Sequence, residues 1–156
     1  MKVFPEQTGP MVSWSKVAAV EGINEALLIL KERYKIILVS NAQDSDRDQV
    51  WEALEMVDLA RYFHEVFTPK ELNARKPAPG FYLNMLKQIE VEPEHAIMIG
   101  DDYEKDIIGA KQVGLWTIWY NPDQKELKNT SFPYHDVEVT HLKELISIIQ
   151  EEMKFR

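Results

Sequence analysis

The stretch Ile97-Met98-Ile99-Gly100-Asp101-Asp102-Tyr103-Glu104-Lys105-Asp106 decides the fold. Its short apolar run, ended by Gly100 and acids, predicts a strand that is buried on both faces. The acids follow the carboxyl end of this strand, where open α/β sheets bind their ligands. Asp101, Asp102 and Asp106 repel one another unless a cation lies among them, and oxygen-bound Mg²⁺ is the natural candidate. The alternative is an acidic helix start with Asp102 as the N-cap.

Outward from this stretch, strand-like and helix-like segments alternate. Strands are expected at residues 36–39, 66–68, 97–100 and 115–120. Helices are expected at 21–33, 81–89, 102–113 and 141–153, and a further helix is capped by one of the early residues of the polar stretch 43–48 and ends at about residue 56. A loop with Pro122 and Pro133 leads to the last helix. The alternation predicts an α/β fold, a Rossmann-like three-layer sandwich with a mostly parallel sheet. We expect residues 1–156 to form a single domain whose residues 1–20 are irregular.

Composition narrows the classes of function. The chain has 156 residues and a net charge of −8, which argues against a nucleic-acid-binding protein. It has no cysteine, which fits a reducing, cytoplasmic compartment and excludes thiolate chemistry. Neither a membrane-spanning run nor a signal-peptide core is expected. The four histidines show no metal-ligand spacing, and Trp116 and Trp119 are expected in the core or an interface, with Trp14 and Trp51 less certain.

Three groups of polar residues follow or lie near predicted strand ends. They are Ser40 with Asn41, then Lys76, then the three aspartates. A hydroxyl, a cation and an acidic metal site are what phosphoryl transfer requires, because the phosphate oxygens need donors and the transition state needs charge neutralisation. Taken singly, Ser40-Asn41 is also compatible with a plain turn, and Lys76 with a surface lysine.

These residues resemble motifs of the haloacid dehalogenase-like (HAD) hydrolase superfamily over residues 20–120. Leu38-Val39-Ser40-Asn41 is similar to its second motif, residues 74–81 to its third and residues 99–110 to its fourth. The resemblance implies that Ser40, Asn41 and Lys76 bind phosphate, and that Lys76 and Asp106 take part in catalysis. The residues themselves could hold Mg²⁺ through Asp101 and either Asp102 or Asp106. The resemblance implies that Asp101 binds Mg²⁺ and that Asp106 helps to orient the metal, water or Lys76. It favours phosphatases over dehalogenases because the fourth motif is of the Gly-Asp-Asp form.

The first motif of the superfamily, a strand ending in Asp-x-Asp, has no counterpart here. The first aspartate of the chain is Asp44, so the covalent nucleophile that the resemblance implies is missing. Its strand lies mid-sheet in the family, so the strands ending at Ser40 and Gly100 must pair directly, or residues 2–4, residues 11–12 or a partner chain must fill the gap. The interval from Asn41 to Lys76 is too short for a large cap domain.

Two main hypotheses follow. The first is a phosphatase-type hydrolase that acts on a phosphorylated substrate. The second is a non-catalytic HAD-like module that binds Mg²⁺, phosphate or a protein partner, and a homo-oligomer is compatible with either. A phospho-receiver domain is disfavoured, because its acids precede its lysine in the chain.

Overall fold

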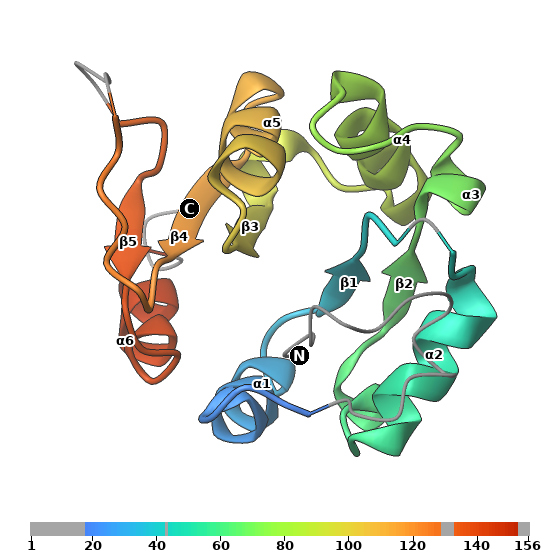
Figure 1. Ribbon diagram of the computed structural model, residues 1–156, viewed down its shortest axis with the longest axis horizontal. Helices are drawn as coiled ribbons and strands as arrows, with labels where there is room; N and C mark the ends of the chain where they lie inside the picture. The colour runs from blue at the N-terminus through green and yellow to red at the C-terminus, as the bar shows by residue number, and fades with distance from the viewer. Residues whose placement is uncertain (1–17, 43, 129–132, 153–156) are drawn as a thin grey trace. The chain divides into compact units, whose positions relative to one another are not determined.

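The computed structural model describes residues 18–42, 44–128 and 133–152. The chain folds into two compact units, Met1–Asn73 and Ala74–Arg156. In Figure 1 the first unit runs from blue to green and the second from green to red. Within the described ranges, no helix is long and apolar enough to cross a membrane. The expected strands at residues 2–4 and 11–12, and Trp14, lie outside those ranges.

The first unit is built around a pair of parallel strands, β1 (Ile37–Val39) and β2 (Glu65–Phe67). Its helices are α1 (Ile23–Lys31), α2 (Arg47–Met56) and the short α3 (Pro69–Leu72). Capping boxes start two of them, Asp46 with Gln49 at α2 and Thr68 with Glu71 at α3. In each box two otherwise unpaired backbone N–H groups gain side-chain acceptors, which fixes where the helix begins.

The core of the first unit lies where the helices meet the strand pair. Its buried residues come from α1, α2, β2 and the turn between the last two: Leu27, Val50, Ala53, Leu54, Leu59, Tyr62 and Val66. Trp51 packs against this cluster while only partly buried. Val50, Ala53 and Leu54 lie at helical spacing, so one face of α2 packs into the core.

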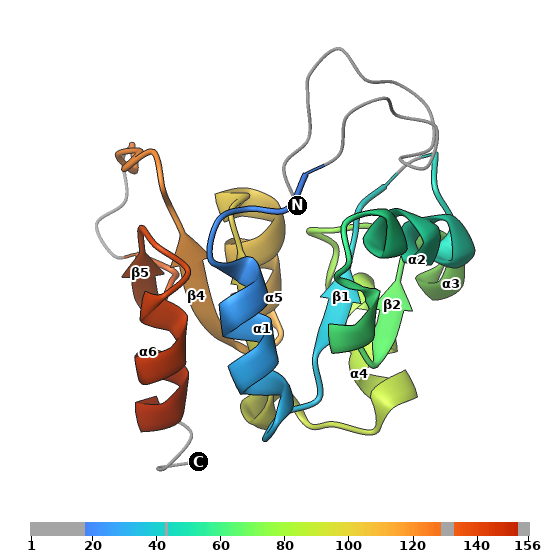
Figure 2. The ribbon, with the colours of Figure 1, turned by 90° about the horizontal axis from the view of Figure 1, so that it is seen from below.

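The second unit carries the sheet β3–β4–β5, in which both strand pairs are parallel. The strands are β3 (Ile97–Gly100), β4 (Trp116–Tyr120) and β5 (Val137–Val139). Helix α4 (Pro79–Ile89) precedes β3, and a π-helix (Tyr103–Ile108) continuing into α5 (Gly109–Gln112) links β3 to β4. Figures 1 and 2 show α6 (Glu144–Glu152) beside the β5 end of this sheet, and its buried residues are Leu145 and Ile149.

The α/β class with parallel strands is confirmed. Among the described residues the parallel strands form one ladder in each unit, β1–β2 in the first and β3–β4–β5 in the second. The helix expected at 102–113 is α-helical only from Gly109. The loop expected before the last helix contains strand β5. This strand was not predicted, because three residues are too few for an alternating pattern to be recognised. The single domain and the missing cap stay predictions.

Candidate functional site

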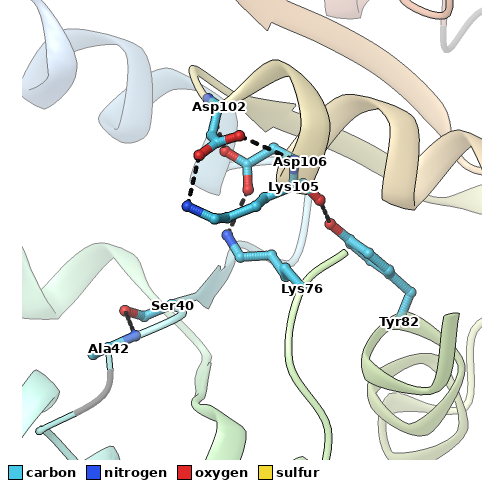
Figure 3. A network of polar contacts seen from close by, with 7 residues as sticks. All are labelled: Ser40, Ala42, Lys76, Tyr82, Asp102, Lys105 and Asp106. Carbon is cyan, nitrogen blue, oxygen red and sulfur yellow. Dashed lines mark hydrogen bonds and ion pairs between the residues drawn. The ribbon is translucent and has the colours of Figure 1, made fainter. Parts of the chain in front are cut away.

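A buried ion pair lies at the centre of the polar residues in the second unit. The Lys76 ammonium is 2.5 Å from Asp106 Oδ1, and the two side chains are only 8% and 7% exposed (Figure 3). The other carboxylate oxygen of Asp106 accepts a hydrogen bond from the Asp102 backbone N–H at 3.2 Å. Lys76 and Asp106, thirty positions apart in the sequence, are thus in direct contact, and their part in catalysis stays a prediction.

Opposing influences act on Asp106. Burial raises the pKa of its carboxyl group, because the charged form loses water, and the nearby charge of Asp101 raises it too. The Lys76 ammonium and the Asp102 N–H oppose this, and the pKa stays above its ordinary value. The lysine is therefore the group that keeps a buried carboxylate charged.

Asp102 starts the π-helix. One of its oxygens accepts a hydrogen bond from the Lys105 backbone N–H at 3.0 Å, and the other pairs with the Lys105 ammonium at 2.9 Å. Partial burial acts to raise the pKa of Asp102, but these bonds outweigh it and hold the pKa below its usual value. The N-cap role considered from the sequence is confirmed, whereas its role as a metal ligand stays a prediction.

Close packing leaves the ion pair little room. A Cβ atom added at Gly100 would lie 2.3 Å from Asp106 Oδ2, and one added at Gly109 would lie 2.9 Å from the Pro77 carbonyl oxygen. Real Cβ atoms do not approach other atoms so closely, so both positions require glycine. Gly100 thereby lets the Asp106 side chain fold back against the end of β3.

Tyr82 is a site residue that sequence reasoning missed. It lies in the helix expected at 81–89, and its hydroxyl donates a hydrogen bond to the Lys105 carbonyl oxygen (Figure 3). Burial and the charges of Asp106 and Asp102 raise the pKa of the Tyr82 phenol. A buried tyrosine usually finds a hydrogen-bond partner for its hydroxyl, and this requirement was the signal in the sequence.

Ser40 and Asn41 lie in the first unit, immediately after β1. The Ser40 backbone N–H donates to the Phe67 carbonyl at 3.0 Å and so extends the ladder between β1 and β2. Its hydroxyl accepts a hydrogen bond from the Ala42 N–H at 3.1 Å. Both residues are half-buried at a strand carboxyl end, as predicted, and their phosphate-binding role stays a prediction.

The donor set of the second unit fits Mg²⁺ with few protein ligands. The described residues contain no group of three acidic, histidine or cysteine side chains that could hold a metal ion. Asp101, however, is exposed at the end of β3, and its charge acts on the buried Asp106. Mg²⁺ commonly takes one or two carboxylates and keeps several waters, so Asp101 is the carboxylate that could hold it. Both oxygens of Asp106 already accept hydrogen bonds, from Lys76 and from the Asp102 N–H.

Comparison with known proteins gives three findings. Residues 6–120 match the model of the haloacid dehalogenase-like hydrolases. The glyceraldehyde 3-phosphate phosphatase of Pyrococcus furiosus is 33% identical over 135 residues, which cover 85% of this chain and 55% of the relative. The chain thus spans about half the length of the curated relatives it matches.

Solved structures agree with the sequence matches. The HAD phosphatase from Thermococcus onnurineus superimposes with a TM-score of 0.68 at 32% identity, over 80% of this chain and 55% of that one. The magnesium-bound structure of YfnB from Bacillus subtilis gives a TM-score of 0.74 at 25% identity, over 83% and 55% of the two chains.

We expect Gly100→Ala to destabilise the chain by about 1–3 kcal/mol, because the new methyl group must displace Asp106. Chemical denaturation measures this free energy. The control is Gly80→Ala in α4, where a Cβ meets nothing nearer than Ala74 at 3.7 Å. That change should be neutral or slightly stabilising. Equal stability of the two variants would contradict the packing argument.

We expect Lys76→Met to destabilise the chain by roughly 3–5 kcal/mol at pH 8, because it leaves a buried carboxylate without its cation. The folded-state pKa of Asp106 is already raised and rises further without Lys76. The destabilisation should therefore shrink as the pH falls through that raised pKa, since protonation removes the buried charge. Denaturation at several pH values measures it, with Lys87→Met, an exposed lysine of α4, as the control. A loss independent of pH would count against this role of Lys76.

Proposed function

Because the chain belongs to the haloacid dehalogenase-like hydrolase family, we propose that it is a phosphatase-type protein that binds Mg²⁺ and a phosphorylated ligand. The observation that carries the proposal is the buried Lys76–Asp106 ion pair beside the exposed Asp101 at the carboxyl end of β3. A cation held by an acid, next to a second acid that is free to meet solvent, suits a phosphate group and a divalent ion.

Each residue of the second unit has a defined task in this proposal. Lys76 donates to phosphate oxygens, and Asp106 holds its ammonium in place. Asp101 supplies the carboxylate for Mg²⁺, which when bound neutralises the negative charge of the phosphoryl group. Asp102 caps the π-helix and so fixes the backbone between the two acids. Ser40 and Asn41 of the first unit are proposed as phosphate-binding residues because residues 38–41 resemble the family's second motif.

The chain supplies the binding groups but, in this proposal, not the attacking one. Residues 1–43 contain no aspartate, so the family's covalent path lacks its nucleophile there. We therefore assign binding, in the cytoplasm, as the main function and slow or no hydrolysis to this chain alone. The names of its relatives support a small phosphorylated molecule as the ligand class. The same names also favour the alternative function, that of an active phosphatase.

We expect Mg²⁺ to bind the wild-type chain and binding to be lost in Asp101→Ala, because this removes the accessible carboxylate ligand. Isothermal titration calorimetry measures the affinity. Asp123→Ala is the matched control, since its exposed side chain pairs only loosely with Lys125, at 3.7 Å. Unchanged Mg²⁺ affinity in Asp101→Ala would refute the proposed metal site.

We expect little hydrolysis of p-nitrophenyl phosphate at saturating Mg²⁺. The reason is that no aspartate precedes Ser40, where the family has the aspartate that attacks phosphorus. Release of nitrophenolate measures the rate. Robust turnover that Lys76→Ala abolishes would establish the active phosphatase in place of the binding module.

A further inference from the structure

Three aromatic side chains of the second unit form a cluster next to Asp101. Tyr103, Trp119 and His135 meet pairwise, with ring centroids 4.7 Å apart for Tyr103 and Trp119, 5.7 Å for Tyr103 and His135, and 5.5 Å for Trp119 and His135. They come from the π-helix, from β4 and from the segment before β5. The cluster therefore joins three separate parts of the unit at one place.

The indole of Trp119 reaches the residue that the proposed metal site needs most. Its Nε1–H donates a hydrogen bond to the Asp101 backbone carbonyl at 3.3 Å. Trp119 pairs with Gly100 in the register of β3 and β4, and its side chain is only 3% exposed. An exposed residue just beyond a strand end is thus tied to a buried side chain of the neighbouring strand.

The indole is itself held in place. The Tyr103 ring packs edge-on against it, and the Tyr103 hydroxyl is fixed by two contacts. It accepts a hydrogen bond from the Tyr134 backbone N–H at 2.9 Å and lies 3.1 Å from His135 Nδ1. The Trp119 indole therefore contacts the residues on both sides of the N-cap Asp102: it donates a hydrogen bond to Asp101, and the Tyr103 ring packs against it. Neither can shift without breaking a contact to the sheet.

We propose that Trp119 is a positioning residue that sets the Asp101 carboxylate for Mg²⁺, with Tyr103 and His135 holding the indole. The inference rests on the proposed Mg²⁺ binding at Asp101. Mg²⁺ requires near-ideal octahedral geometry, so a ligand fixed before binding loses less entropy when the ion arrives. Groups that orient metal ligands typically change affinity by about 10–100-fold when removed.

The decisive variant is Trp119→Phe, which keeps an aromatic ring at this place but removes the N–H donor. A residue that only fills space would leave Mg²⁺ affinity unchanged apart from a loss of stability. A positioning residue predicts an affinity lower by roughly tenfold in a chain that still folds. Trp116→Phe, at the other end of β4 and also buried, is the matched control, with affinity unchanged.

Calorimetry and tryptophan fluorescence test this together. We expect Mg²⁺ to change the fluorescence of the wild type and of Trp116→Phe, and this change to disappear in Trp119→Phe, since the reporting indole is bonded to the ligand residue. Lack of Mg²⁺ binding by the wild type removes the proposed function and this inference with it. Normal binding by the wild type together with equal affinity in Trp119→Phe overturns the inference alone.

If Trp119→Phe does not fold, the variant Tyr103→Phe tests whether the indole positions Asp101. It keeps the ring against the indole but removes the hydroxyl that Tyr134 and His135 hold. A several-fold loss of Mg²⁺ affinity in this variant supports the positioning role, and unchanged affinity contradicts it.

Discussion

The second unit depends on one constraint, which is that a lysine and an aspartate stay charged and in contact where water scarcely reaches. Lys76 and Asp106 are each more than nine-tenths buried. Such a pair adds little net stability, because desolvation offsets most of the attraction, but breaking it is costly. Its effect is therefore to specify one arrangement. The segment before α4 and the π-helix after β3 must meet at this point, and the glycines at 100 and 109 provide the space.

This constraint gives three neighbouring aspartates three different properties. Asp106 is buried and its pKa is raised, so its charge depends on the lysine. Asp102 is engaged by Lys105 and has a lowered pKa, so it remains an anionic cap. Asp101 is exposed, and its backbone carbonyl is bound by the Trp119 indole. Three aspartates could in principle all face one cation. Here Lys76 and Lys105 engage two of them, and only the Asp101 carboxylate is exposed.

The sequence predicted the positions of strands and helices better than the details of their backbone. The spacing of apolar residues located β3 and α4, because buried strands and amphipathic helices leave strong patterns. Lys76 and Asp106 were singled out by the resemblance to family motifs and not by spacing. The π-helix at 103–108 was not predicted, since the same apolar spacing suits an α-helix. Its formation coincides with the Tyr82 hydroxyl bond to the Lys105 carbonyl, a tertiary contact. Strand β5 was missed because three residues carry too little periodicity, and it is fixed by pairing with β4.

The charged residues proposed to bind Mg²⁺ and phosphate lie together in one part of the chain. Lys76, Asp101 and Asp106, together with the packing that fixes them, all come from the unit Ala74–Arg156. The contacts described for these residues, to Asp102 and to the Trp119 indole, also lie within this unit. Burial, the ion pair and the indole hydrogen bond together fix the positions of the charged groups. The geometry of the charged site therefore follows from the packing of the second unit itself, because each of these contacts joins two of its own segments.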